Sequence, residues 1–167
     1  MKKKLLKIAF LDRDGALIWE PLTDHQIDSL EKLRILDGVI EALQELQWRN
    51  YCLALITNQD GLGTTSFPRE TFEAPQRKML QIFKKNGIEF EEILICPHFP
   101  KDQCLCRKPK LGLVKYFLEN NQIDLQGSFV YGDRESDEKF AKNLGIKFIK
   151  TETNTSAAPL YSFIQQL

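Results

Sequence analysis

The 167-residue sequence has no long hydrophobic run and no excess of charge of either sign. No apolar stretch approaches the roughly 20 residues that a membrane-spanning helix needs. Lysine and arginine together number 23, as do aspartate and glutamate, so nothing global favours nucleic acid or an anionic membrane as a partner. The segment Met1–Lys4 is basic, but the apolar run that follows is short and ends at Asp12, which is typical of a core strand and not of a signal peptide. We therefore predict a cytoplasmic protein that binds neither nucleic acid nor membrane and is a monomer or a weak dimer.

Cysteine is scarce, and three of the four cysteines are clustered. In a cytosolic chain such clustering favours a metal site over disulfides. Cys96, His98, Cys104 and Cys106 form the pattern Cys-x-His-x5-Cys-x-Cys, and three thiolates with one imidazole suit tetrahedral Zn²⁺. Since no fifth group is evident, we predict a structural zinc-binding loop. The alternative is a set of free thiols on an irregular loop.

Short apolar runs alternate with amphipathic segments along the chain. Strands are predicted over Leu5–Leu11, Cys52–Thr57, Ile93–Cys96, Phe129–Tyr131 and Ile146–Ile149. Helices are predicted over Val39–Arg49, Phe72–Lys85, Leu111–Glu119, Ser136–Leu144 and Ala158–Gln166. This alternation predicts an α/β fold, with a doubly wound, Rossmann-like, mainly parallel sheet and helices on both faces. No repeat or linker is evident, so residues 1–167 are expected to form a single domain.

Two segments fit neither the helical nor the strand period. Trp19–Arg34 is predicted to form a flap beside the end of the first strand, with a short helical piece around Leu30–Ile35. Gly61–Pro68 is predicted to be an irregular loop after the second strand. Because the core takes up most of the chain, we expect only a minimal cap.

Polar residues follow four of the predicted strands. They are Asp12 and Asp14 after the first, Thr57 and Asn58 at the end of the second, Lys108 after the third, and Asp133 and Asp137 after the fourth. In a doubly wound sheet these strand ends meet at one crevice, where ligands bind. Neighbouring carboxylates repel each other, so a fold that retains them usually provides a cation or a reaction for them. The set predicts phosphoryl transfer to a carboxylate.

The acids take distinct predicted roles. Asp12 is the expected nucleophile, which forms an aspartyl-phosphate, and Asp14 the general acid and base. Mg²⁺ is expected to offset the repulsion between Asp12 and the phosphate. Its predicted ligands are Asp12, Asp133 and the backbone carbonyl of Asp14, with Asp137 in contact with a metal-bound water or with Lys108. As alternatives, the first two acids could belong to a plain turn or calcium loop, and Asp133 and Asp137 could cap a helix.

Three further residues are predicted to handle the phosphate. The Thr57 hydroxyl and the Asn58 backbone N–H are expected to bind its oxygens. Lys108 is expected to act as a catalytic positive charge that stabilises the transition state.

Four motifs, each placed after a predicted strand, resemble those of the haloacid dehalogenase superfamily of phosphatases. They are Asp12–Gly15, Thr57–Gln59, Lys108–Pro109 and Gly132–Asp133 with Asp137. The cysteine pattern resembles the subgroup that contains histidinol-phosphate and heptose-bisphosphate phosphatases, and the segments Glu20–Leu33 and Thr57–Pro68 favour the first. The resemblance implies Mg²⁺-dependent hydrolysis of L-histidinol phosphate, a step of histidine biosynthesis.

Two other functions stay open. One keeps the mechanism but changes the substrate to heptose bisphosphate or another small sugar phosphate. The other follows from Ala16, where members of the family usually carry threonine, and is a degenerate, zinc-stabilised interaction domain.

The predicted substrate is a small phosphate monoester with an ammonium and an imidazole, so acids are expected near the nucleophile. Glu20 or Asp60 is expected to meet the amine, and Gln26 to line the pocket. Arg13 is also predicted to bind phosphate or substrate. The alternative for the acids is that they are solvated loop residues.

Overall fold

A five-stranded parallel sheet forms the centre of the computed structural model, which describes residues 5–167. Its strands are β1 (Lys7–Leu11), β2 (Tyr51–Asn58), β3 (Glu92–Cys96), β4 (Phe129–Gly132) and β5 (Lys147–Lys150). They lie in the order β3-β2-β1-β4-β5, and every neighbouring pair is parallel. The direction of winding reverses between β1 and β4, so the carboxyl ends of these two strands flank the crevice where such sheets bind ligands. The basic segment Met1–Lys4 lies outside the described residues.

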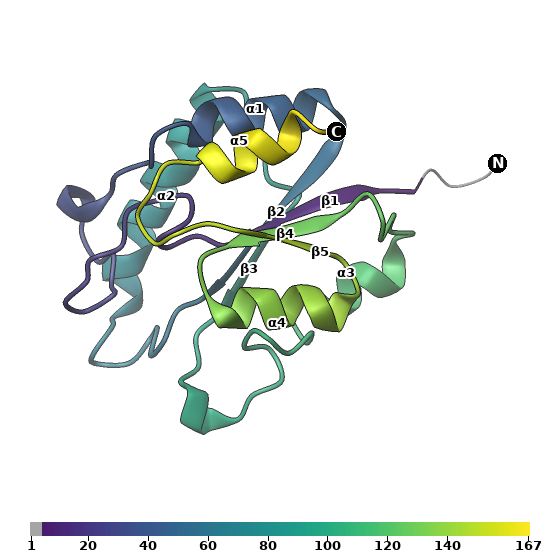
Figure 1. Ribbon diagram of the computed structural model, residues 1–167. Helices are drawn as coiled ribbons and strands as arrows, with labels where there is room; N and C mark the ends of the chain where they lie inside the picture. The colour runs from purple at the N-terminus through teal and green to yellow at the C-terminus, as the bar shows by residue number, and fades with distance from the viewer. Residues whose placement is uncertain (1–4) are drawn as a thin grey trace.

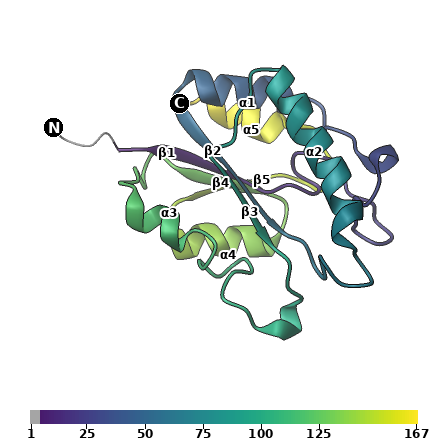
Figure 2. The ribbon, with the colours of Figure 1, turned by 180° about the vertical axis from the view of Figure 1, so that it is seen from behind.

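Helices cover both faces of the sheet (Figures 1 and 2). One face carries α1 (Val39–Trp48), α2 (Arg69–Lys85) and α5 (Ala158–Ile164), and the other carries α3 (Lys115–Asn120) and α4 (Glu135–Leu144). The alternation of side chains along β1 serves both layers: Ala9 and Leu11 pack with the first set of helices, while Ile8 and Phe10 pack with the second. The predicted doubly wound α/β fold is therefore confirmed. Among residues 5–167, no helix has both the length and the hydrophobicity required to cross a membrane.

The loops that follow β1, β2 and β3 lie at the same end of the sheet, away from the start of β1 (Figure 1). Residues 12–38 form the flap and contain the short 3-10 turn η1 (Leu30–Lys32). Residues 59–68 form the second loop, and residues 97–114 form the Cys/His loop, which contains η2 (Pro100–Asp102). These loops overhang the crevice in place of a larger cap.

One predicted helix begins later than expected. Periodicity predicted a helix from Leu111, but α3 starts at Lys115. Backbone hydrogen bonds hold the preceding residues in turns instead, since the N–H of Gly112 donates to the Leu105 carbonyl at 3.0 Å. These turns pack the segment back against the Cys/His loop.

Candidate active site

Three aspartates gather at the carboxyl ends of β1 and β4. One carboxylate oxygen from each of Asp12, Asp133 and Asp137 lies within 4.8 Å of the other two. The backbone N–H of Asp12 donates to the Tyr131 carbonyl at 2.9 Å, which continues the pairing of β1 with β4 and fixes Asp12 beside the later acids. The Asp137 residue is fully buried and Asp12 nearly so. Because these carboxylates repel one another in a poorly solvated place, the site requires positive charge.

Lys108 supplies a positive charge within this cluster. Its Nζ donates to Asp12 at 2.7 Å, to Asp137 at 2.6 Å and to the Ile56 carbonyl at 2.9 Å. Burial disfavours the ammonium, but the two carboxylates outweigh it and raise the pKa of Lys108 above its ordinary value. The Asn58 side chain fixes the lysine backbone, because it accepts from the Lys108 N–H at 3.0 Å and donates to the Lys108 carbonyl at 3.2 Å.

Asp133 and Asp137 differ in how their oxygens are used. Asp137 caps α4 by accepting from the Arg134 N–H at 3.1 Å, as one alternative expected, but its other oxygen faces Lys108. Asp133 accepts from Thr153 Oγ1 at 2.6 Å, while its Oδ1 is buried and has no hydrogen-bond partner. Burial, with the nearby Asp12 charge, raises the pKa of Asp133 to about 7. A buried carboxylate oxygen with no hydrogen bond, with Arg134 Nε 4.0 Å away and two other carboxylates beside it, fits a hard cation such as Mg²⁺.

Asp14 is held on both oxygens. Arg13 Nη1 donates to one at 2.6 Å, and Gln59 Nε2 donates to the other at 2.6 Å. The same Gln59 amide lies 2.8 Å from Thr57 Oγ1, so it joins the ends of β1 and β2. Burial raises the pKa of Asp14 above its ordinary value, and Arg13 only partly offsets this. Gln59 has no role predicted from the sequence, although it belongs to the motif Thr57–Gln59.

Arg13 lies behind Asp14. Its side chain is fully buried, and its guanidinium carbon lies 4.9 Å from the centroid of the Phe72 ring. Two cavities open at this end of the sheet, and Arg13 lines neither of them. Phe72 in α2 stabilises the cation by its ring face. The structure thus directs Arg13 to Asp14 and Phe72 and not to the pocket where a substrate contact was predicted.

Two adjoining cavities open at the carboxyl ends of the strands. The small one is lined by Asp12, Asp14, Thr57, Asn58, Lys108, Arg134 and Ser136. The larger one, of about 270 Å³, is lined by Asp14, Glu20, Asp24, His25, Gln26, Asn58, Gln59, Asp60, Phe67, Phe99 and Arg134. The small cavity therefore brings together Asp12, Lys108 and the predicted phosphate-binding residues Thr57 and Asn58. Glu20, Gln26 and Asp60 line the larger cavity.

The two acids predicted to meet the substrate amine already have partners. Glu20 contacts the Arg134 guanidinium and lies 3.2 Å from His25 Nδ1. Asp60 contacts Arg107. Burial opposes the charge of Arg134, but Glu20 raises its pKa above the ordinary value. Arg134 has no role predicted from the sequence: it directly follows Asp133, but it is 114 residues from its partner Glu20.

The charges around the larger cavity follow a pattern. Four lining carboxylates each have a cationic partner, in the pairs Asp14–Arg13, Glu20–Arg134, Asp24–Lys32 and Asp60–Arg107. Of these four cations only Arg134 lines the cavity. Among the lining residues, carboxylates therefore outnumber arginines, and three of the four cationic partners do not line the cavity.

The Cys/His cluster is assembled as its spacing predicted. Cys96, at the end of β3, lies 3.6 Å from His98 Nδ1, 3.6 Å from Cys104 and 3.1 Å from Cys106, measured between the sulfur or nitrogen atoms. Ligands about 2.3 Å from one ion lie at similar separations, so the four donors could hold a metal ion. The loop also packs onto its neighbour: a Cβ on Gly61 would collide with the Phe99 ring.

Gly15 allows the loop after β1 to approach Asp133. Its φ is +80°, and a Cβ there would lie 2.7 Å from Asp133 Oδ2. We expect Gly15→Ala to lower the free energy of unfolding by about 2–4 kcal/mol, from backbone strain and steric overlap together. Gly87→Ala is the matched control, because Gly87 has a φ of +72° but open space around it, and should cost only about 1–2 kcal/mol. Denaturant unfolding measures both, and equal losses would contradict the predicted overlap.

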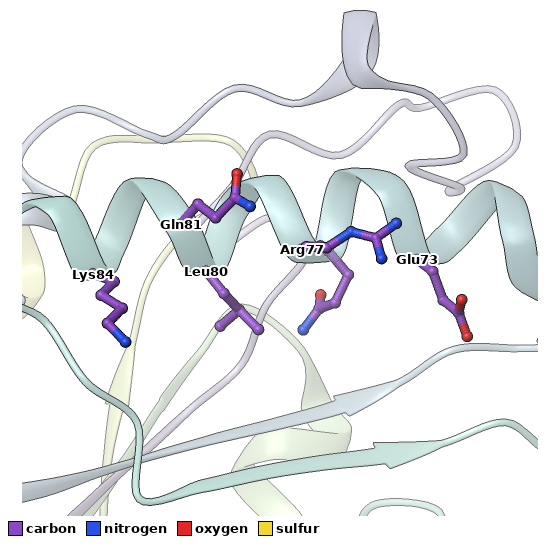
Figure 3. Close-up of a pocket in the computed structure, with 6 residues that line it drawn as sticks. Glu73, Arg77, Leu80, Gln81 and Lys84 are labelled. Atoms are coloured by element: carbon purple, nitrogen blue, oxygen red, sulfur yellow. The ribbon is translucent and has the colours of Figure 1, made fainter.

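A separate groove of about 380 Å³ runs along α2 (Figure 3). It is lined by Glu73, Gln76, Arg77, Leu80, Gln81 and Lys84, all from that one helix. It shares no residue with the cavities at the strand ends, and we assign it no part in the chemistry.

Comparisons with known proteins agree with this geometry. A family model described as polynucleotide kinase 3 phosphatase matches residues 7–154. The histidine biosynthesis bifunctional protein HisB of Baumannia cicadellinicola subsp. Homalodisca coagulata is 52% identical over 89% of this chain and 42% of that protein. HisB of Actinobacillus pleuropneumoniae serotype 3 is 53% identical over 84% of this chain and 39% of its own length. The chain thus spans about two fifths of the length of the curated relatives it matches.

Solved structures share the fold. The D,D-heptose 1,7-bisphosphate phosphatase from B. bronchiseptica, complexed with magnesium and phosphate, superposes with a TM-score of 0.83 and 26% identity, over 97% of this chain and 100% of that one. A HAD-superfamily hydrolase from Geobacter sulfurreducens superposes with a TM-score of 0.63 and 14% identity, over 97% of this chain and 100% of that one. At this identity the similarity shows the fold alone.

Proposed function

Because the chain belongs to the family described as polynucleotide kinase 3 phosphatase, within the haloacid dehalogenase superfamily that its motifs resemble, we propose that residues 1–167 act as one phosphatase domain. The proposed reaction is the hydrolysis of L-histidinol phosphate to L-histidinol and phosphate. One observation carries the proposal: Asp12, Lys108 and Asp133 meet in the crevice beside a cavity whose wall presents carboxylates.

The first step is attack on phosphorus by a carboxylate oxygen of Asp12, which forms an acyl-phosphate bond as the ester P–O bond breaks. The departing alkoxide takes a proton from Asp14. Burial raises the pKa of Asp14, which favours the protonated form needed for this transfer. Gln59 and Arg13 hold the two carboxyl oxygens of Asp14 and so fix where the proton is delivered.

The second step releases phosphate. A water attacks the phosphorus of the phosphoenzyme, Asp14 accepts the proton of that water, and the Asp12 carboxylate is regenerated as inorganic phosphate leaves. The Thr57 hydroxyl and the Asn58 N–H would bind the non-bridging oxygens in both steps. The Lys108 ammonium, 2.7 Å from Asp12, would stabilise the charge that gathers on the transferring group.

The acidic cluster would hold Mg²⁺ through Asp12, Asp133 and the backbone carbonyl of Asp14. Asp133 Oδ1, buried without a hydrogen-bond partner, supports this assignment. Both oxygens of Asp137 already accept hydrogen bonds, which favours contact with a metal-bound water over direct ligation. When bound, the ion would supply the charge that offsets repulsion between Asp12 and the phosphate.

The Cys/His loop would hold Zn²⁺ through Cys96, His98, Cys104 and Cys106. Four donors complete a tetrahedral set, which suits a structural site and leaves no open position for chemistry. Lys108 follows Cys106 by two residues, so an ordered loop would help to place the catalytic ammonium.

The cavity favours a cationic leaving group. Four carboxylates line it and three of their four cationic partners do not, so an ammonium or imidazolium is attracted there. The relatives named for histidine biosynthesis, at about half identity over most of this chain, support histidinol phosphate. Heptose bisphosphate stays a second candidate because of the solved phosphatase of that name.

Four expectations from the sequence remain predictions: a cytoplasmic location, a monomeric or weakly dimeric state, and the lack of nucleic-acid and of membrane partners.

The test is a comparison of kcat/KM for L-histidinol phosphate and D,D-heptose 1,7-bisphosphate, with and without Mg²⁺. We expect Mg²⁺-dependent phosphate release and a preference of about 100-fold or more for histidinol phosphate, since several aligned charges distinguish the two leaving groups. The reverse preference would select the heptose function. No release from either ester would favour the degenerate domain inferred from Ala16, which lies fully buried in the core.

A further inference from the structure

Two arginines beside the larger cavity are each held by a carboxylate from a different loop. Glu20, on the flap after β1, contacts the Arg134 guanidinium. Asp60, on the loop after β2, contacts Arg107 of the Cys/His loop. Both acids line the cavity. Glu20 is 2% exposed whereas the Arg134 side chain is 43% exposed, so solvent ions reach this pair only from the arginine side.

An arginine without such a partner would be suited to bind phosphate, because its planar donors match phosphate oxygens. Arg134 lines both the small cavity and the larger one, so it lies between the reacting phosphate and the leaving group. Arg107 does not line the cavity, and it contacts Asp60, which does, and donates to the His98 carbonyl at 3.1 Å. A second phosphate on a leaving group in the larger cavity would meet Arg134 at its wall, and would meet Arg107 where Asp60 gives way.

The two carboxylates block that use of the arginines. An incoming phosphate could reach Arg134 or Arg107 only by displacing Glu20 or Asp60. The displaced carboxylate would lose its arginine beside another anion. That loss costs more for Glu20, whose side chain is 3% exposed, than for Asp60, whose side chain is 43% exposed. Such a penalty selects against a competing substrate without any contact to the preferred one.

We propose that Glu20 and Asp60 are specificity-determining residues, which mask Arg134 and Arg107 and thereby exclude substrates that carry a second phosphate. This inference rests on the proposed function, because it concerns which leaving group the same site accepts. It assigns the two acids a role different from direct contact with the substrate amine.

The test measures the ratio of kcat/KM for D,D-heptose 1,7-bisphosphate to that for L-histidinol phosphate in Glu20→Gln and in Asp60→Asn. Each substitution frees one arginine and is expected to raise this ratio about tenfold or more, the effect of one charge-assisted contact. Asp28→Asn is the matched control. Asp28 also lies on the flap and loses the same charge, but it pairs with Lys32 at 2.9 Å and does not line the cavity, so its ratio should change by less than about two-fold.

The double variant Asp60→Asn/Arg107→Gln removes both members of one pair and is expected to lose the gain of Asp60→Asn. A gain that survives the loss of Arg107 would overturn the proposal, and so would ratios no higher than that of Asp28→Asn. A preference of the unmodified chain for the bisphosphate would overturn the masking as well as the proposed function. If the proposed function alone fails, the unmodified chain releases phosphate from neither ester. Calorimetric binding of the bisphosphate to the same variants decides the masking in that case: tighter binding to Glu20→Gln and Asp60→Asn supports it, and unchanged binding refutes it.

Discussion

Asp12→Asn is expected to abolish phosphate release, with a loss in kcat of about 10⁴-fold or more, as when an enzymatic nucleophile is removed. An amide oxygen is a poor nucleophile and cannot form the acyl-phosphate. The fold should persist, because Lys108 keeps its hydrogen bonds to Asp137 and to the Ile56 carbonyl. Steady-state phosphate release measures the loss, and circular dichroism verifies the fold.

The Asp12 prediction has a direct chemical readout. In the unmodified chain, rapid acid quenching during turnover should trap a phosphoryl group on Asp12, detectable by peptide mass spectrometry, and Asp12→Asn should trap none. Asp37→Asn, which removes an exposed carboxylate just before α1, should keep full activity. A phosphoryl group found on another residue, or turnover retained in Asp12→Asn, would rule out this nucleophile.

Lys108→Met is expected to reduce both stability and turnover. The substitution leaves Asp12 and Asp137 without their shared cation in a buried place, and breaking a buried ion pair in this way costs about 3–5 kcal/mol. Since Mg²⁺ would bring positive charge to the same acids, it should restore part of the lost stability. It should not restore kcat, which is expected to fall about 10²–10³-fold with the loss of a charge directed at the transferring group.

Thermal and denaturant unfolding with and without Mg²⁺ separate the two effects of Lys108. Lys115→Met provides the comparison, because Lys115 in α3 has an exposed side chain, paired only loosely with Glu119 at 3.9 Å. It should alter neither stability nor turnover measurably. If Lys108→Met proved as stable as Lys115→Met in the absence of metal, the buried cation would not be needed to hold the acids together.

Much of the catalytic geometry could be predicted because it depends on strand ends. Apolar runs mark β1 to β4, and in a parallel sheet the residues after each run must meet at one edge. Asp12, Asp133 and Lys108, which follow β1, β4 and β3, could therefore be placed together without knowledge of any contact. The spacing of the four Cys/His donors worked in the same way, since a short loop keeps them close.

The charges of the substrate cavity could not be predicted in this way. Glu20 and Arg134 are far apart in sequence and meet only where the flap contacts the residues after β4. Asp60 meets Arg107 only where two loops touch. Loop conformation is set by side-chain contacts that have no sequence period. For the same reason Arg13, adjacent to two predicted catalytic acids, was expected in the pocket although Phe72 of α2 holds it in the core.

The reciprocal pair of hydrogen bonds between Asn58 and the Lys108 backbone has an evolutionary consequence. It ties the ammonium to the central sheet, so the segment between Cys96 and Arg107 need not carry that task alone. Insertions or substitutions at the tip of this segment can therefore reshape the entrance for new leaving groups while the reaction centre stays in register. The fold thus separates the residues that transfer the phosphoryl group from the loop residues around the departing alcohol, and the second set can change without the first.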